Sequence, residues 1–328
     1  MTDRHESAAT LPGRDNLDVL DVLDAAVASV PEFAGRKLAF EPMSGGLTNR
    51  IYRVGADSTP VAVARVSSRK SSLLAIDREA EMRNAEAAAH AGVGPRVLTA
   101  MPGIGISLVE WIDGRTFEAR DLDDARQLNR VAAQCRQLHA GPRFANDFDM
   151  FAVQRGYLAV VRERGFRLPN RYLEFMPQVD VMRAALAVRA DGTVPCHNDL
   201  LAANILDDGT RLWFIDYEYS GNNDACFELG NIWSEATLPL DRLEHLITAY
   251  YGLASRAKLA RARLLALMSK YGWTLWASIQ DAVSDADFDF WSWGMEKYDR
   301  AVAEFDSAEF AALIDDVQQP ETTRELAK

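Results

Sequence analysis

Three oxygen-bearing side chains stand close together in the second half of the sequence. Asp199 precedes Asn204 by five residues, and Asp216 follows after a short apolar stretch. A carboxylate can orient an attacking hydroxyl and accept its proton, while hard oxygen ligands can hold Mg²⁺ against phosphate groups. Because phosphoryl transfer from ATP needs both functions, this set predicts a phosphotransferase site. Asp199 would be the catalytic base, and Asn204 and Asp216 would bind the metal.

The surrounding residues predict the local structure that would bring this set together. An apolar strand at 194–196 leads into the loop, and a hairpin with an Asp-Gly turn follows over 205–215. The return strand would deliver Asp216 beside Asn204 and Asp199. The alternative is a loop in which Asp and Asn only cap turns. The combined pattern, His-x-Asp-x-x-x-x-Asn and then Ile-Asp-Tyr-Glu, favours the site.

Length, charge and cysteine usage restrict the class of protein. The chain has 328 residues, of which 48% are apolar, and this is enough for a substantial core and two lobes. A net charge of −12 argues against nucleic acid as a partner and is compatible with a cationic substrate. We expect neither a secretory signal nor a transmembrane span. Cys135, Cys196 and Cys226 show no metal spacing, so we expect reduced thiols in a cytoplasmic protein.

The periodicity of the first sixty residues predicts a helix, a strand, a glycine loop and a second strand. Residues 1–16 are polar, and we expect them to be flexible. Apolar spacing predicts a helix over 17–30, and strands at 37–40 and 50–54 flank the loop. Backbone N–H groups of such a loop can approach phosphates, although a plain hairpin turn is the alternative. The candidate nucleotide-binding residues here are Ser44, Gly45, Gly46, Thr48 and Asn49.

The stretch from Pro195 to Glu235 resembles the choline/ethanolamine kinase branch of the aminoglycoside-phosphotransferase-like kinases. Cys-His-Asn-Asp-Leu-Leu-Ala-Ala-Asn-Ile-Leu is similar to that group's catalytic loop, and Ile-Asp-Tyr-Glu-Tyr-Ser-Gly to its metal-binding segment. The Gly-Gly-x-Thr-Asn loop is similar as well, and the resemblance extends from about residue 40 to about residue 305. It implies an α+β, two-lobed, protein-kinase-like fold. A small antiparallel-sheet N-lobe over 17–112 would bind nucleotide, and a larger, mostly helical C-lobe over 113–328 would bind the acceptor.

The resemblance also implies further nucleotide contacts. Arg65, in an alternating strand at 61–66, takes the place of the basic residue that holds the α- and β-phosphates, and a guanidinium can grip phosphate oxygens in bidentate fashion. A surface Arg on an edge strand is the alternative. In the helix predicted over 76–91, alignment of the following Gly-Pro turn selects Glu81 as the ion-pair partner of Arg65, with Glu79 as competitor. Backbone groups near Glu110 and Ile112, at the hinge between the lobes, would pair with adenine.

Tryptophan is concentrated towards the C-terminal end. Five of the seven Trp residues follow Asn231, and Trp273 and Trp276 share one face of a helix predicted over 262–283. Aromatic residues at such spacing are usually core residues. A quaternary ammonium, however, has no N–H to donate and is held by aromatic faces and a carboxylate. The resemblance places a choline cage at Tyr219, Glu235, Trp273, Trp276 and Trp293.

Together with the resemblance, these patterns predict Mg²⁺-dependent transfer of the γ-phosphoryl group of ATP to a small cationic amino alcohol. Choline is the expected acceptor, and ethanolamine is the nearest alternative. Asp199 would contact the acceptor hydroxyl as its base, and Glu218 would assist through water or a second metal. The same transfer to thiamine or an aminoglycoside is an alternative. Two others are an inactive module that binds nucleotide or choline, and a scaffold built on the kinase fold. The sequence does not specify the oligomeric state.

Overall fold

Two compact units make up the chain. The computed structural model describes residues 19–43, 49–67, 73–74 and 76–320. One unit consists of residues 1–67 with 98–111, and the other of 68–97 with 112–328. Residues 68–97, which the predicted N-lobe included, belong to the second unit. The lobe boundary at residue 112 stays a prediction.

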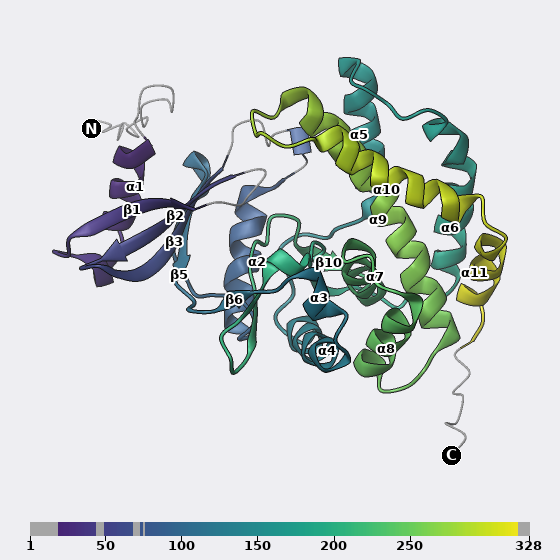
Figure 1. Ribbon diagram of the computed structural model, residues 1–328, viewed down its shortest axis with the longest axis horizontal. Coiled ribbons are helices and arrows are strands. Elements are labelled where there is room, and N and C mark those ends of the chain that lie inside the picture. The colour runs from purple at the N-terminus through teal and green to yellow at the C-terminus, as the bar shows by residue number, and fades with distance from the viewer. Residues whose placement is uncertain (1–18, 44–48, 68–72, 75, 321–328) are drawn as a thin grey trace, which may run out of the picture. The chain divides into compact units, whose positions relative to one another are not determined.

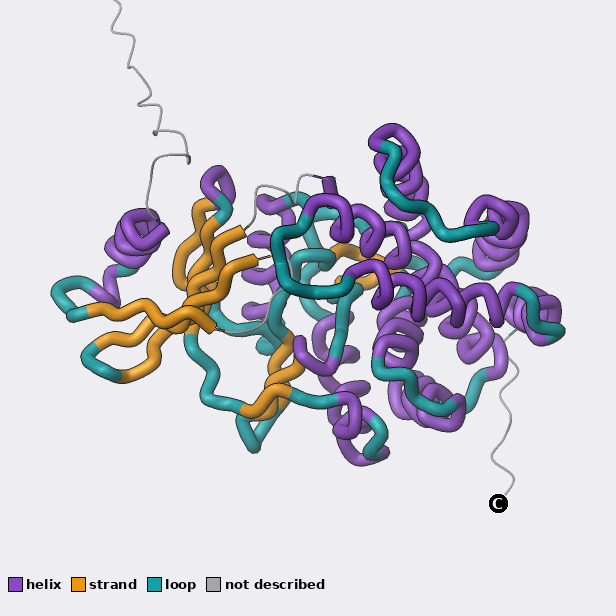
Figure 2. Tube along the Cα trace, turned by 45° about the horizontal axis from the view of Figure 1, so that its top comes forward, coloured by secondary structure: helices purple, strands orange, loops and turns teal. Residues whose placement is uncertain are grey.

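The first unit is a five-stranded sheet packed against one helix (Figure 2). Its elements are α1 (Val19–Ala28), η2 (Pro31–Phe33), β1 (Leu38–Met43), β2 (Asn49–Ala56), β3 (Thr59–Ser67), β4 (Val97–Met101), η4 (Pro102–Ile104) and β5 (Ile106–Glu110). The strand order is β1-β2-β3-β5-β4, and β1, β2, β3 and β5 pair antiparallel. Leu23 and Val27 of α1 are buried with Val54 and Leu108 of the sheet. The predicted helix and the three predicted strands of this region are confirmed.

The second unit is mostly helical. Its helices are α2 (Arg78–His90), α3 (Ala119–Leu122), α4 (Ala125–His139), α5 (Met150–Arg164), η5 (Tyr172–Phe175), α6 (Met176–Val188), η6 (Ala202–Asn204), α7 (Ala225–Glu235), α8 (Leu240–Tyr251), α9 (Arg256–Val283), α10 (Phe290–Phe305) and α11 (Glu309–Val317). Its short strands are β6 (Arg115–Thr116), β7 (Val194–Cys196), β8 (Ile205–Asp207), β9 (Leu212–Phe214) and β10 (Gly221–Asn223). None of the helices in the described part of the chain has the length and apolarity to cross a bilayer.

Helix α9 is the central element of this second unit. From Ala260 to Gln280 almost all of its side chains are buried. Helices α5, α7, α10 and α11 pack around it (Figure 1). A helix buried on all sides has no solvent face, which explains why α9 is apolar around most of its circumference.

Glycine allows two of these helices to approach α9 closely. A Cβ atom built on Gly230 of α7 would overlap the carbonyl oxygen of Ala262. A Cβ atom on Gly294 of α10 would lie 2.5 Å from the Cβ of Ala277. Since a side chain at either position would push the helices apart, the two glycines hold α7 and α10 in position against α9.

We expect Gly230→Ala to lower the free energy of unfolding by about 1–3 kcal/mol, because the added methyl group must displace the α9 backbone. Chemical denaturation of the purified protein measures this change. Gly156→Ala is the matched control, since it also lies inside a helix and its Cβ would meet no described atom within 4 Å. It should stabilise the protein by about 0.5–1 kcal/mol. Equal stability of both variants would contradict the close crossing.

Candidate active site

The predicted strand, loop and hairpin are all present. Strand β7 leads into the loop, η6 ends at Asn204, and β8 pairs antiparallel with β9. In the turn between them the Asp208 carboxylate accepts hydrogen bonds from the backbone N–H groups of Thr210 and Arg211, each at 2.8 Å. The hairpin therefore forms from local signals, as the Asp-Gly turn predicted.

A series of hydrogen bonds joins the loop to the end of the hairpin. His197 Nε2 donates to the carbonyl oxygen of Ile215 at 2.8 Å, and the Ile215 N–H donates to the carbonyl oxygen of Asn204 at 3.0 Å. The Asn204 side-chain amide donates in turn to the carbonyl oxygen of Asp199 at 2.8 Å. Because Asp216 follows Ile215 directly, the structure brings Asp199, Asn204 and Asp216 together. Their catalytic roles remain proposals.

The neutral imidazole of His197 connects two parts of this network through hydrogen bonds. Burial lowers the pKa of its imidazole, so the ring is uncharged near neutral pH. With Nε2 donating to Ile215, Nδ1 is the acceptor, and it lies 3.3 Å from the backbone nitrogen of Asp199. A single tautomer therefore ties the residue before Asp216 to the catalytic loop.

Glu228, a residue outside the predicted site, anchors the loop. It is fully buried on α7, and its two carboxylate oxygens accept hydrogen bonds from the backbone N–H groups of His197 at 2.8 Å and Asn198 at 2.7 Å. Burial alone would raise the pKa of Glu228, but His139, 3.7 Å away, and the His197 N–H lower it below its ordinary value. The one sequence signal is an acidic residue between Phe227 and Leu229, on the buried face of a helix.

Two residues of the site have left-handed backbone conformations. Asn198 has φ of 66° and Asp216 has φ of 69°, which is uncommon outside glycine. The Asn198 side-chain amide donates to the carbonyl oxygen of Tyr219 at 3.0 Å, which holds its backbone in place. Conformations of this kind persist where the surrounding structure enforces them, as it does at many active sites.

The donor atoms present suit a hard divalent cation. The side-chain amide nitrogen of Asn204 donates a hydrogen bond to the carbonyl oxygen of Asp199, so the amide oxygen of Asn204 is the atom available to a metal. Asp216 supplies a carboxylate. Amide and carboxylate oxygens are ligands that Mg²⁺ prefers. The residues predicted to hold Mg²⁺ therefore fit it chemically.

Asp199 lies in an acidic, partly buried environment. Burial raises the pKa of its carboxyl group well above the ordinary value, and the charges of Glu235, Asp216 and Glu218 raise it further, while Lys297 opposes them. A raised pKa makes the carboxylate a stronger base. This suits a residue that accepts a proton from a hydroxyl group.

The four predicted aromatic cage residues form one continuous cluster. Tyr219 meets Trp273 edge-on, with ring centroids 4.9 Å apart, and its hydroxyl oxygen accepts a hydrogen bond from Trp276 Nε1 at 2.7 Å. Trp276 packs edge-on against Trp293 at 5.4 Å. The shared face of Trp273 and Trp276 is confirmed, and both residues also belong to the buried core of the second unit. Trp273 and Trp276 therefore also have the core role that was the alternative to a cage.

Glu235, the predicted carboxylate of the cage, has a basic partner that was not predicted. Its Oε2 forms an ion pair with Nζ of Lys297, and the two side chains are only 6% and 7% exposed. The same Nζ lies 4.2 Å from the ring centroid of Trp293, one turn earlier on α10. A lysine ammonium is thus part of the predicted cage.

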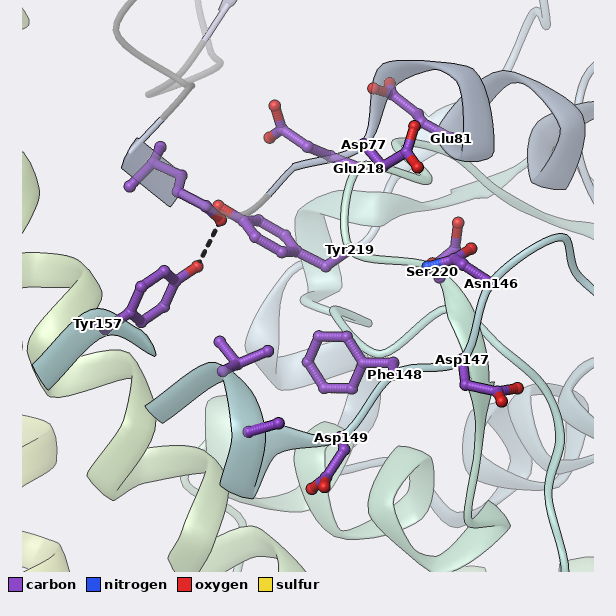
Figure 3. Close-up of a pocket in the computed structure, with 13 residues that line it drawn as sticks. Asp77, Glu81, Asn146, Asp147, Phe148, Asp149, Tyr157, Glu218, Tyr219 and Ser220 are labelled. Carbon is purple, nitrogen blue, oxygen red and sulfur yellow. Dashed lines mark hydrogen bonds between the residues drawn. The ribbon is translucent and has the colours of Figure 1, made fainter. Parts of the chain in front are cut away.

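A small pocket adjoins the cluster at Tyr219. Its volume is about 230 Å³, and its lining includes Glu218, Tyr219, Tyr157 and Phe148. Figure 3 shows these residues with several carboxylates, and Tyr157 donates a hydrogen bond to the carbonyl oxygen of Leu74 at 2.7 Å. The described residues of the lining include five acidic side chains: Asp77, Glu81, Asp147, Asp149 and Glu218. Arg78 pairs with Glu81 and Glu218, so part of this negative charge is already balanced.

The two candidate carboxylates of α2 differ in exposure. Glu81 is buried, whereas Glu79 is exposed, which favours Glu81 as the structural partner. Arg78 bridges Glu81 at 2.7 Å and Glu218 at 2.8 Å. The pairing of Glu81 with Arg65 stays a prediction, because Arg65 belongs to the first unit.

Arg65 lies on an interior strand. Strand β3 runs between β2 and β5, with Arg65 opposite Ile51 and Ser107, so the edge-strand alternative is wrong. Asn49 is buried at the start of β2, Glu110 ends β5, and Ile112 is the first residue of the second unit after that strand. The other predicted loop residues, Ser44, Gly45, Gly46 and Thr48, lie outside the described residues.

Known proteins are similar to this chain over most of its length. The family of choline/ethanolamine kinases matches residues 40–245. Ethanolamine kinase 2 of Homo sapiens is 24% identical over 323 residues, which cover 87% of this chain and 82% of that protein.

Solved structures extend the comparison to the fold. A choline/ethanolamine kinase family protein from Mesorhizobium loti is 31% identical with a TM-score of 0.77, and the match covers 91% of this chain and 99% of the other. Choline kinase LicA from Streptococcus pneumoniae is 20% identical with a TM-score of 0.72, covering 87% and 98%. The predicted protein-kinase-like fold is confirmed. The chain belongs to the choline/ethanolamine kinase family and is a phosphotransferase with an alcohol group as acceptor.

Proposed function

We propose that this enzyme transfers the γ-phosphoryl group of ATP to the hydroxyl group of choline. The observation that supports choline is the aromatic cluster of Tyr219, Trp276 and Trp293 with the carboxylate of Glu235. Aromatic faces and a carboxylate are what a quaternary ammonium requires. Because the charge of Glu235 raises the pKa of Asp199, the cage adjoins the proposed base.

Ethanolamine is the second candidate acceptor. Glu235 Oε1 is buried and has no hydrogen-bond partner among the described residues. A primary ammonium can donate a hydrogen bond to this oxygen, whereas the quaternary ammonium of choline cannot. The similarity to human ethanolamine kinase 2 also supports this acceptor.

In the proposed reaction Asp199 orients the acceptor hydroxyl and accepts its proton as the oxygen attacks the phosphorus atom. Asn204 and Asp216 would hold Mg²⁺, which neutralises phosphate charge when bound. His197 and Glu228 fix the loop backbone, so Asp199 needs little reorganisation during the reaction. Positioning and electrostatics supply most of the rate enhancement.

The nucleotide contacts in this proposal come from the segments predicted for it. Arg65 would neutralise phosphate charge, supported by Glu81, and residues 44–49 would supply backbone N–H groups. Backbone groups near Glu110 and Ile112 would pair with adenine. We place the enzyme in the cytoplasm, where ATP is available and its three free, buried cysteines stay reduced.

The proposal is tested by measuring ATP consumption by the purified enzyme with Mg²⁺ and choline, ethanolamine, thiamine or an aminoglycoside. We expect kcat/KM to be highest with choline and measurable with ethanolamine. Preference for thiamine or an aminoglycoside would contradict the acceptor. No ATP consumption with any of them would contradict the activity itself.

Asp199→Asn should lower kcat by about 10²–10⁴-fold, because the general base is lost. The raised pKa means that the ionised carboxylate destabilises the folded enzyme when the pH is above the folded pKa. The variant should therefore melt at a higher temperature than the wild type near pH 8. This gain should vanish towards about pH 4, where the unfolded Asp is also protonated. Near-normal turnover would contradict the assigned role.

Trp276→Ala should raise the KM for choline about tenfold, since a cation–π contact contributes about 0.5–2 kcal/mol, and leave the KM for ATP unchanged. Trp291→Ala is the matched control. The guanidinium carbon of Arg167 lies 3.7 Å from the ring centroid of Trp291, which is not one of the predicted cage residues. Steady-state kinetics of both variants, with melting temperatures, make the comparison. An equal rise in both KM values for Trp276→Ala would show a packing defect instead of a cage residue.

A further inference from the structure

Lys297 makes the contacts expected of a bound substrate. Its side chain is almost fully buried on α10, and its ammonium pairs with Glu235 Oε2. The ammonium also faces Trp293, with Nζ 4.2 Å from the ring centroid. A carboxylate and an aromatic face are the two groups that the proposed choline cage would offer. Lys297 therefore uses both of them within the chain.

Only one of the two carboxylate oxygens of Glu235 takes part in this ion pair. Oε2 carries the ion pair, while Oε1 is buried without a hydrogen-bond partner among the residues that the structure describes. An unpaired buried carboxylate oxygen is costly, so it favours a ligand that can donate to it or place positive charge beside it. The carboxylate can thus be shared between Lys297 and a second cation.

The chain contains a second lysine with the same two kinds of contact, which serves as a reference. Lys258 of α9 pairs with Asp191 at 2.6 Å, and its Nζ lies 5.0 Å from the ring centroid of Tyr251. Neither Asp191 nor Tyr251 belongs to the predicted cage. Lys297 differs because both of its partners are cage residues.

We propose that Lys297 is a resident cation of the acceptor site, whose ammonium competes with the acceptor's own cation for Glu235 and the face of Trp293. It thereby sets the affinity and selectivity for the acceptor. This inference rests on the proposed function, since it deepens the description of the same site. A primary ammonium can share Glu235 by donating to Oε1, whereas a quaternary ammonium needs the aromatic face that Lys297 covers. Lys297 therefore weakens choline more than ethanolamine.

The test is Lys297→Met, which keeps the apolar length of the side chain and removes its charge. We expect the Kd for tetramethylammonium, measured by calorimetry, to fall about tenfold, which corresponds to about 1.4 kcal/mol. The ratio of kcat/KM for choline to that for ethanolamine should rise by a similar factor. Lys258→Met, which removes the same charge outside the cage, should leave the Kd within about twofold. An unchanged or higher Kd in Lys297→Met would overturn the proposal, because a lysine that only supports Glu235 would weaken binding when removed.

Two further measurements keep the test independent of folding and of turnover. If Lys297→Met does not fold, NMR of the wild-type enzyme with labelled lysine follows the Lys297 ammonium directly. Addition of tetramethylammonium should shift this signal as the ion pair opens, and no shift would overturn the proposal. Tetramethylammonium has no hydroxyl group, so its binding does not depend on phosphoryl transfer. The enzyme could phosphorylate none of the tested amino alcohols and still bind tetramethylammonium tenfold more tightly as Lys297→Met. That result would refute the proposed function and support the role of Lys297.

Discussion

The buried carboxylate of Glu228 is the contact on which the site depends. It accepts hydrogen bonds from the backbone N–H groups of His197 and Asn198, at the start of the loop that carries Asp199. Glu228 lies on α7, and the same helix reaches α9 through Gly230 and ends at Glu235. One helix therefore links the loop that carries Asp199 to Glu235. A shift of α7 would disturb both segments together.

The site combines groups that stabilise the fold with groups that oppose it. Tyr219 and Trp276 contribute apolar burial and a hydrogen bond, so the cage also adds to the core. Asp199 does the reverse, since burial and neighbouring carboxylates disfavour its charged form. Packing along α9 contributes stability in the same unit, where almost all side chains from Ala260 to Gln280 are buried.

Local signals were enough to predict the hairpin and the convergence of Asp199, Asn204 and Asp216, because an Asp-Gly turn and a short loop leave few alternatives. Periodicity likewise predicted α9 and its shared tryptophan face. The contacts of Glu228 and Lys297 were not predicted. They join segments that are distant in sequence, and a charged residue in an amphipathic pattern is usually exposed. Only the packing of α7, α9 and α10 shows that these charges are inside.

The complete burial of α9 has a consequence for how such an enzyme can change during evolution. A substitution on α9 that altered the cage would also disturb four packed helices, so most would be lost through instability. Helix α10 is different, because many of its residues are partly exposed and yet it supplies Trp293 and Lys297 to the site. We therefore expect the proposed acceptor site to change mainly through α10. One wall of that site is constrained by packing on all sides, and the other is not.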